Sequence, residues 1–401
     1  MKWYQLFLEG MLHMKERYVI IISVSVLLIT SCLGHFVLPG LLLEEVNPKK
    51  DNQFDSYISS QLTQRYFQDN SNRSTDAIIE IVCDQNLSDY GFPGTGTASD
   101  PFRIENLSLE TTSFYLLYIY GTTKHILIRN CTFFARRSTI VLGPLAPGTV
   151  TIDNCTIRTR NYDGILCHAD NVTISNCLFE RNYDGISYSS CSFLKIVNNT
   201  FRNNYRGVFT FQNDGWSTII DNYFHHNSGG VYIINSPHTT ICGNVFLSNR
   251  VSILFDSTSP SPSSSFCVVT DNRIENSSYY GIIITGFLGQ DFSRDNLIFG
   301  NSFANNNNSA SSQAKDDGLY NMWYNKTAKQ GNYWSDWWGV GGYKIDGWAK
   351  SYDFYPVAKP LHDLETPVPV FLKGRAIIFS AIAFIILISL AISLLFRARA
   401  K

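Results

Sequence analysis

Short apolar segments recur along the middle of the chain at a nearly constant spacing. Each copy has two or three β-branched or apolar residues, then a small polar pair, then an aromatic residue or isoleucine. The successive intervals are 24, 22, 22, 23, 22, 28 and 29 residues, and the closing positions are Phe133, Ile157, Phe179, Phe201, Phe224, Phe246, Ile274 and Phe303. This period fits one coil of a β-solenoid. The two long intervals carry insertions at 257–265 and 287–294, which we expect to form loops outside the stacked core.

Aligning the coils on these positions places polar and small residues in columns. Two residues before each one stand Cys131, Cys155, Cys177, Asn199, Asn222, Asn244, Asn272 and Asn301. Further along each coil stand Asn161, Asn182, Asn204, Asn227 and Asn249, and then Gly164, Gly185, Gly207, Gly230 and Gly281. Parallel strands repeat about every 4.8 Å, so stacked amides can form a hydrogen-bonded ladder, and Asn and Gly both tolerate the positive φ of tight corners.

These patterns predict an all-β fold, a single-stranded right-handed parallel β-helix of about 8–10 coils. An α/β fold would need amphipathic helices between the strands, and the sequence has none. We expect the β-helix to cover 76–310 and a Trp-rich segment at 311–365 to close its end, because five of the seven Trp residues fall between Trp323 and Trp348.

Two apolar segments flank this region. Residues 376–396 carry no charge and are long enough to span a bilayer, and a basic tail, 397–401, follows them. A second apolar segment, 18–43, follows a basic start and lies within a predicted signal-anchor region, 1–46, with a polar stalk at 47–75. The flanking positive charges predict a cell-membrane protein with both termini in the cytoplasm and the β-helix on the extracytoplasmic side. A cleaved signal peptide, or a lipidated Cys32, is the alternative for the first segment.

The charge and the sequons narrow the class of partner. The net charge is −1 and only 16% of residues are charged, which argues against nucleic acid, since phosphate binding needs a clustered basic face. Asn-x-Ser/Thr sequons would permit glycosylation, although several fall within the repeat, at Asn72, Asn86, Asn106, Asn130, Asn154, Asn171, Asn198, Asn276, Asn307 and Asn325.

Several sequence segments resemble those of one known protein family. The segment 94–104, Gly-Thr-Gly-Thr-Ala-Ser-Asp-Pro-Phe-Arg-Ile, resembles the entry segment of NosD-like right-handed parallel β-helix proteins. The segments 331–336, 343–347 and 353–356 resemble their closing segment, and with the coils the resemblance covers about 84–361. It implies a surface or periplasmic protein, and the NosD name implies help in loading copper into nitrous-oxide reductase.

Copper handling would require soft or imidazole ligands that converge. His226 and His238 are the candidates, and because neighbouring strand residues point to opposite faces, at most one of His225 and His226 can join His238. The Cys131, Cys155 and Cys177 column is better explained as small buried residues in a ladder, although one adjacent pair could form a disulfide.

Chemistry on acidic polysaccharides is a second possibility. Asp163, Asp184 and Arg206 occupy one column on three successive coils, immediately before the corner glycines. Enzymes of similar fold use stacked aspartates with a basic residue as a lyase or epimerase site, and close carboxylates raise one another's pKa, as a general base requires. Asp before Gly is, however, also a common turn pair.

Aromatic residues offer a third type of site. Tyr162, Tyr183 and Tyr205 form a column that could stack on sugars or simply cover a corner, and Trp334, Trp337 and Trp338 are predicted to plug the end of the helix, with a ligand platform as the alternative. Asp336, Asp346 and Asp353 could bind Ca²⁺, although their spacing is not that of an EF-hand.

The leading hypothesis is a non-catalytic, membrane-anchored surface protein that binds a glycan or an envelope protein along one face. The alternatives are an enzyme acting on acidic glycans at Asp163, Asp184 and Arg206, and a copper-handling protein. Fold alone does not decide between them.

Overall fold

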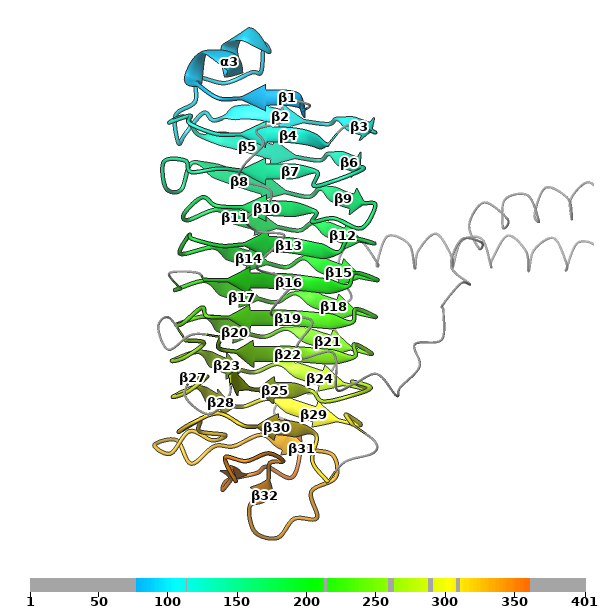
Figure 1. The fold of residues 1–401 in the computed structure, drawn as a ribbon, viewed down its shortest axis with the longest axis vertical. Coiled ribbons are helices and arrows are strands. Elements are labelled where there is room, and N and C mark those ends of the chain that lie inside the picture. Colours follow the sequence, from blue (N-terminus) through cyan, green and yellow to red (C-terminus); the bar gives the residue numbers. More distant parts are fainter. Residues whose placement is uncertain are drawn as a thin grey trace, which may run out of the picture. The chain divides into compact units, whose positions relative to one another are not determined.

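The chain folds as a right-handed parallel β-helix in a computed structural model that describes residues 77–112, 114–212, 215–258, 263–287, 291–307 and 311–360. Each coil except the last contributes one strand to each of three long parallel sheets, called sheets A, B and C here, and the last coil adds a strand to sheets A and C only (Figure 1). All pairings within the three sheets are between strands of successive coils, in the register expected when equivalent side chains stack.

Sheet A has ten strands: β1 (Ala77–Ile81), β4 (Tyr115–Ile119), β7 (Ile140–Leu142), β10 (Ile165–Cys167), β13 (Asp184–Tyr188), β16 (Arg206–Phe211), β19 (Gly229–Ile234), β22 (Val251–Asp256), β25 (Ile282–Ile284) and β30 (Ala314–Asp316). Sheet B has nine: β2 (Phe102–Glu105), β5 (Ile126–Arg129), β8 (Val150–Asp153), β11 (Thr173–Ser175), β14 (Lys195–Val197), β17 (Thr218–Ile220), β20 (Thr240–Cys242), β23 (Val268–Thr270) and β28 (Leu297–Phe299).

Sheet C has ten strands: β3 (Ser108–Thr111), β6 (Thr132–Ala135), β9 (Thr156–Thr159), β12 (Leu178–Glu180), β15 (Thr200–Arg202), β18 (Tyr223–His225), β21 (Val245–Leu247), β24 (Arg273–Glu275), β29 (Ser302–Ala304) and β31 (Tyr333–Trp334). Two short antiparallel pairs lie outside these sheets: β26 (Gly286–Phe287) with β27 (Asp291–Phe292), and β32 (Tyr343–Lys344) with β33 (Tyr352–Asp353).

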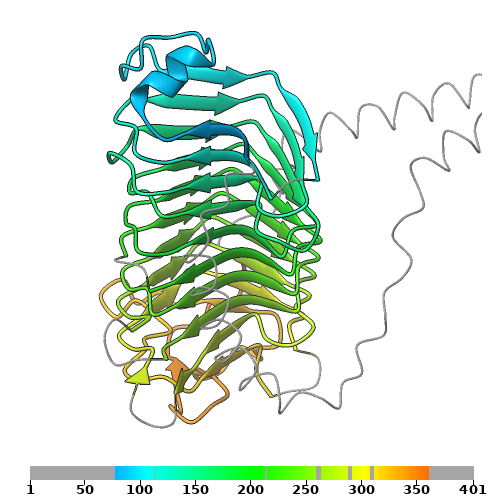
Figure 2. The same ribbon diagram turned by 45° about the horizontal axis from the view of Figure 1, so that its top comes forward.

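The core is a stack of aromatic and aliphatic side chains from the three sheets. Phe179, Phe201, Phe224 and Phe246 are fully buried, and their rings stack with centroids 4.7–4.8 Å apart. This distance equals the rise between strands, so the periodic anchor positions of the sequence become one continuous interior column. Figure 2 shows the coils layered along this axis.

Two buried asparagine ladders close the turns on either side of sheet C. Asn199, Asn222, Asn244, Asn272 and Asn301 stack in successive coils, and the side-chain oxygen of each of the last four accepts the backbone N–H of the asparagine one coil earlier at 2.8–3.0 Å. Asn182, Asn204, Asn227 and Asn249 form a second ladder with the same geometry. Asn161 is exposed and does not extend this ladder, because its coil has one extra residue between the anchor and the corner glycine.

The two ends of the solenoid are covered differently. At the N-terminal end, the short helix α3 (Asp84–Asp89) lies beside β1. At the C-terminal end, Trp334 stacks between Phe303 and Tyr343, with ring centroids 4.2 and 4.1 Å away, and Trp323 is also fully buried. Strands β30 and β31 continue sheets A and C into the predicted closing segment.

No helix among the described residues is long and apolar enough to cross a membrane. The predicted membrane segments at 18–43 and 376–396, the stalk at 47–75 and the tail at 397–401 lie outside the described residues.

Candidate functional site

The structure pairs two of the three predicted catalytic residues with each other. Asp184 on β13 lies opposite Arg206 on β16 in the sheet register, and the guanidinium donates to both carboxylate oxygens at 2.6 and 2.8 Å. Only 2% of Asp184 and 4% of Arg206 is exposed. A buried bidentate pair of this kind neutralises both charges and uses the carboxylate oxygens that a general base needs.

Aromatic rings enclose the guanidinium of Arg206. Its central carbon lies 3.7 Å from the ring centroid of Phe209 and 5.2 and 5.7 Å from those of Tyr183 and Tyr205. Cation–π contacts hold an arginine by its flat face. The arrangement therefore favours a structural role for Asp184 and Arg206 over the predicted catalytic one.

The predicted tyrosine column supplies part of this enclosure. Tyr183 and Tyr205 stack on each other, with centroids 4.7 Å apart, and burial raises the pKa of Tyr205. Tyr162 is 39% exposed and lies beside Arg137, whose guanidinium is 5.3 Å from the ring centroid. A sugar ring stacks on an open aromatic face. Since Tyr183 and Tyr205 cover one face of each other and flank Arg206, they make a poor sugar platform.

A different aromatic column stands exposed at the corner between sheets A and B. We call it the corner ridge, and it consists of Phe193, Trp216, His238 and Phe266. His238 is sandwiched between Trp216, at 4.3 Å, and Phe266, at 5.3 Å, with ring planes within 14° of parallel. Phe193, Trp216 and Phe266 are 52%, 55% and 49% exposed.

The backbone of the corner ridge is strained. Its four residues have φ between 55° and 62°, in the left-handed region. Non-glycine residues other than Asn, Asp and His rarely adopt this conformation, and bulky aromatic residues such as Phe and Trp do so at a cost. Asn171 and Asp295 occupy the equivalent corners of flanking coils with similar φ values, which shows that the corner itself is suited to Asn and Asp. Strain retained under large exposed side chains is characteristic of functional surfaces.

The two predicted copper ligands lie at different corners. His226 follows β18, between sheets C and A, whereas His238 lies between β19 and β20, in the corner ridge. The closest approach of imidazole nitrogens instead joins neighbours: Nδ1 of His226 lies 2.7 Å from Nε2 of His225. Burial, followed by the nearby His226 and Arg202, lowers the pKa of His225 to about 4, so its imidazole is neutral at neutral pH. Metal ions bind the neutral imidazole.

The described residues supply few other copper ligands. They contain no group of three His, Cys, Asp or Glu side chains arranged to hold a metal ion. Cys131, Cys155 and Cys177 are buried free thiols in the column that the asparagine ladder continues, and Cys177 N–H donates to Asn199. A hydrogen bond with Cys155, together with burial, raises the pKa of Cys131, so its ligating thiolate form is disfavoured. The adjacent, hydrogen-bonded imidazoles of His225 and His226 therefore replace the predicted pair of His226 and His238 as the copper-ligand candidates.

The acidic residues suggested for Ca²⁺ each serve different donors. Asp353 is buried and accepts the backbone N–H groups of Asn332 and Tyr355 and the indole N–H of Trp334. Asp336 accepts hydrogen bonds from the side chains of Gln313 and Tyr343. Asp346 accepts hydrogen bonds from the hydroxyl groups of Tyr280 and Ser311. Through these hydrogen bonds the three carboxylates hold the closing segment in place. Calcium binding stays a prediction.

The predicted tryptophan plug is correct for Trp334 and wrong for Trp338. Trp334 is 1% exposed, whereas Trp338 is 96% exposed and projects from the loop after β31. Trp337 is half-buried against the core, and Trp323 completes the interior packing instead. The sequence could not separate Trp337 from Trp338, because adjacent positions in a loop have no fixed periodicity.

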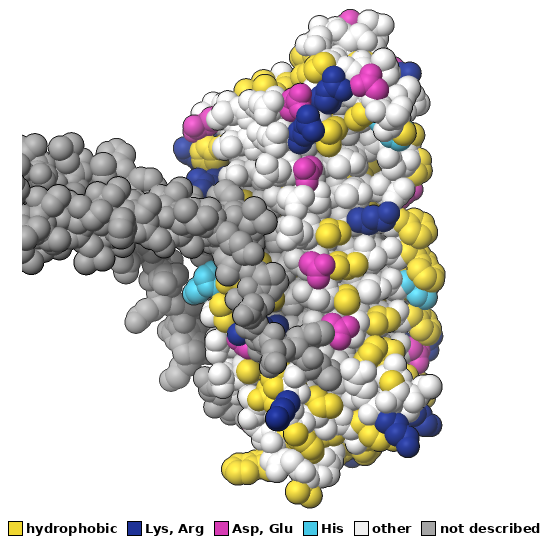
Figure 3. Space-filling view, turned by 180° about the vertical axis from the view of Figure 1, so that it is seen from behind, with side chains coloured by type: hydrophobic (Ala, Val, Ile, Leu, Met, Phe, Trp, Pro, Cys, Tyr) yellow, Lys and Arg dark blue, Asp and Glu magenta, His cyan; other side chains and the backbone are white. Residues whose placement is uncertain are grey.

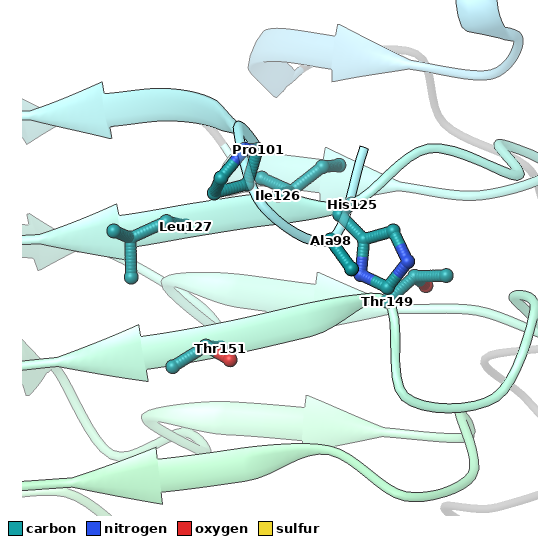
Figure 4. Close-up of a pocket in the computed structure, with 7 residues that line it drawn as sticks. All are labelled: Ala98, Pro101, His125, Ile126, Leu127, Thr149 and Thr151. Atoms are coloured by element: carbon teal, nitrogen blue, oxygen red, sulfur yellow. The ribbon is translucent and has the colours of Figure 1, made fainter. Parts of the chain in front are cut away.

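A shallow depression lies on the outer face of sheet B near the N-terminal end. Figure 4 shows its lining, in which His125 and Leu127 from β5 and its approach lie near Thr149 and Thr151 of the next coil. Its lining also includes Ala98, Pro101 and Ile126, but no carboxylate, so it lacks the paired acids of a glycan-cleaving site.

Several predicted glycosylation sites lie at the corner between sheets B and C. Asn106, Asn130, Asn154 and Asn198 adopt positive φ there, and the last three donate their side-chain N–H to the asparagine one coil earlier, at 2.6–3.4 Å. This ladder explains the asparagines structurally, and glycosylation remains a prediction.

Comparison with known proteins places the chain among β-helices. A family model described as "Periplasmic copper-binding protein (NosD)" matches residues 123–339. No curated protein matches the sequence. Among solved structures, the complex of XylC with xylose is similar at a TM-score of 0.36 and 11% identity, and covers 54% of this chain and 52% of its own. The alginate lyase from Paenibacillus sp. str. FPU-7 is similar at a TM-score of 0.32 and 9% identity, and the match covers 62% of this chain and 96% of the lyase chain. Neither likeness bears on activity.

Proposed function

This chain belongs to the NosD family of parallel β-helix proteins, and on that premise we propose that it is a non-catalytic, extracytoplasmic binding protein. Its ligand is a protein of the cell envelope that receives the corner ridge. The observation that carries this proposal is the retention of Phe193, Trp216 and Phe266, large and exposed, in a backbone conformation that disfavours them.

The shape and composition of the ridge favour a protein partner. Small ligands and glycans usually bind in concave sites, whereas the ridge follows a corner where the chain turns from sheet A to sheet B. Exposed aromatic residues, Trp above all, supply most of the binding energy at protein interfaces. An apolar ridge of this kind fits a groove on a partner.

Glycan binding is less favoured by the same geometry. His238 has an aromatic ring on each face, and Trp216 and Phe266 each have one face covered by His238. The imidazole of His238 therefore offers no open face to a sugar, and Trp216 and Phe266 each offer at most one, whereas sugars stack on ring faces.

An enzymatic function at Asp163, Asp184 and Arg206 is the alternative with the least support. The ion pair between Asp184 and Arg206 uses both carboxylate oxygens, and the guanidinium lies against Phe209. A uronate substrate would have to displace Asp184 from Arg206, which removes a strong charge-assisted hydrogen-bond pair.

Site-specific photocrosslinking tests the proposal. A photoreactive phenylalanine would replace Phe193 or Phe266 in the full-length protein in its native cells. Asn203, which is exposed and equally left-handed at the corner between sheets C and A, provides the matched control position. We expect one defined protein adduct from both ridge positions and none from Asn203. The purified partner should then bind the full-length protein directly, and less tightly when Trp216 and Phe266 are replaced by alanine.

Two results would overturn the proposal. One is the absence of any ridge-specific adduct. The other is binding of a purified polysaccharide that is abolished by the same alanine substitutions, which would make the ridge a glycan site.

Copper handling is retained as a second candidate because one observation favours it. Nδ1 of His226 and Nε2 of His225 form a 2.7 Å hydrogen bond on the surface of sheet C and its corner, so two imidazoles lie side by side there. These two residues, and not His238, would hold a copper ion carried as cargo, and imidazole is a suitable ligand for it.

A further inference from the structure

The closing segment exposes large apolar side chains that its own packing does not use. Trp338, Val340, Trp348 and Phe354 are 96%, 87%, 89% and 59% exposed, and together we call them the tip cluster. The same segment buries Trp323 and Trp334 to complete the core. Single exposed apolar residues are ordinary, but two nearly bare indoles, a valine and a phenylalanine within residues 338–354 indicate a binding surface.

The tip cluster lies on loops at the C-terminal end of the solenoid. Trp338 and Val340 are in the loop between β31 and β32, Trp348 is in the turn between β32 and β33, and Phe354 directly follows β33. Figure 1 shows these elements at the lower end of the stack. Gly339 and Gly341 flank Val340, and a side chain at either position would meet no atom within 4 Å, so this loop extends into open space.

Lysines outnumber acidic residues in the stretch of chain that carries the tip cluster. Five lysines between Trp323 and Pro360 are all exposed: Lys326, Lys329, Lys344, Lys350 and Lys359. The same stretch holds three aspartates, Asp336, Asp346 and Asp353, of which Asp353 is fully buried, so the formal net charge of the stretch is +2. Figure 3 shows basic and apolar side chains together on the lower part of the solenoid. Exposed lysines next to apolar residues match the anionic interface of a bilayer.

The length of the following chain limits how far this end can lie from the predicted membrane segment. Fifteen residues, 361–375, separate the last described residue from the apolar segment 376–396. Fully extended, they would reach about 50 Å at about 3.3–3.6 Å per residue. The tip cluster is thus the described surface with the shortest tether to that segment.

We propose that the tip cluster inserts into the lipid interface of the membrane and holds the β-helix with its C-terminal end against the bilayer. The indoles of Trp338 and Trp348 lie at the headgroup level, as tryptophan does in the aromatic belts of membrane proteins, and the lysines face anionic headgroups. This inference goes beyond the proposed binding function and does not depend on the corner ridge or on its partner.

Fluorescence quenching in defined vesicles tests it. The full chain would be reconstituted alone into vesicles of phosphatidylcholine and phosphatidylglycerol, with and without bromine atoms on the acyl chains. The quenched part of the tryptophan emission should fall in W338F/W348F relative to the unsubstituted protein. It should not fall in W216F, because Trp216 belongs to the corner ridge. Charge reversal in K344E/K350E should reduce quenching of Trp338 and Trp348 in vesicles that contain phosphatidylglycerol.

Equal quenching in the unsubstituted protein and in W338F/W348F would overturn the inference, since the two indoles would then be outside the lipid. Because these vesicles contain no other protein, that result would point to a protein partner for the tip cluster. A failed cross-link at the corner ridge would leave this outcome unaffected, so the two proposals can fail separately.

Discussion

Arg206 holds both carboxylate oxygens of Asp184 across two successive coils, with nitrogen–oxygen distances of 2.6 and 2.8 Å. The sequence places these two residues in one column, and that column alone suggested that both would act on a substrate. In the structure they form an ion pair with each other instead. Their charges stabilise the stacking of β13 on β16 and are withdrawn from the surface.

Breaking this pair should strongly destabilise the fold. We expect Asp184→Ala to lower the free energy of unfolding by about 3–5 kcal/mol, because it leaves a buried guanidinium without its counter-charge. Replacing both residues together, as D184L/R206M, should recover much of the loss. Urea unfolding of the full-length protein in detergent measures both changes.

The exposed pair Glu105–Arg129 supplies the control, with a 2.6 Å contact between partly exposed side chains. Glu105→Ala should cost no more than about 1 kcal/mol, as surface ion pairs usually do. Equal effects of Glu105→Ala and Asp184→Ala would contradict the structural role assigned to Asp184.

The asparagine ladder should be equally sensitive to a single substitution. The side-chain oxygen of Asn222 accepts two N–H groups of Asn199, and its amide donates to the carbonyl of Ile196. Asn222→Ala should lower the free energy of unfolding by about 2–4 kcal/mol, because each buried polar group left unsatisfied costs about 1–3 kcal/mol. Lys195→Ala, on the exposed face of sheet B, should change it by less than about 0.5 kcal/mol. Thermal unfolding followed by circular dichroism compares the two, and a similar effect of both would argue against the ladder.

The repeat made the coils, the core stack and the asparagine columns predictable, because residue type alone recurs there with a fixed period. Side-chain direction does not follow from such columns. The columns therefore aligned Asp184 with Arg206 but could not show that the two side chains bind each other. They also grouped His226 with His238, although these residues occupy different corners of the β-helix.

The corner ridge carried a signal that the alignment on the Phe column missed. Phe193, Trp216, His238 and Phe266 each stand three residues before the inward residue of the next sheet B strand, namely Ile196, Ile219, Ile241 and Val269. The four residues are of three types and the chain lengths before them vary, so no column of identical residues marks them. An alignment on the inward residues of sheet B would have found them.

If the chain carries copper, the adjacent histidines His225 and His226 should bind the ion. We expect H225A/H226A to lower the affinity of the full-length protein for Cu(I) at least tenfold, because both adjacent imidazoles are removed. His238→Ala should leave the affinity unchanged, since the rings of Trp216 and Phe266 hold that imidazole in the ridge. Competition with a chromophoric Cu(I) chelator measures both variants. Loss of affinity in His238→Ala alone would reverse this assignment.

Substitution of Trp216 by asparagine separates stability from binding in the corner ridge. Asparagine is found at the equivalent corner, Asn171, and tolerates positive φ better than tryptophan. Trp216→Asn should therefore keep the free energy of unfolding or raise it by up to about 1 kcal/mol, which chemical denaturation would detect. A decrease in the free energy of unfolding of more than about 2 kcal/mol would mean that Trp216 is needed to stabilise the fold.

The affinity of the same Trp216→Asn protein for the cross-linked envelope partner is the most direct test of the account. A ridge retained for binding predicts at least a tenfold weaker complex from a protein whose stability is unchanged, as expected when a central interface tryptophan is removed. An unchanged dissociation constant would show that the exposed, strained aromatic column is not where this protein binds.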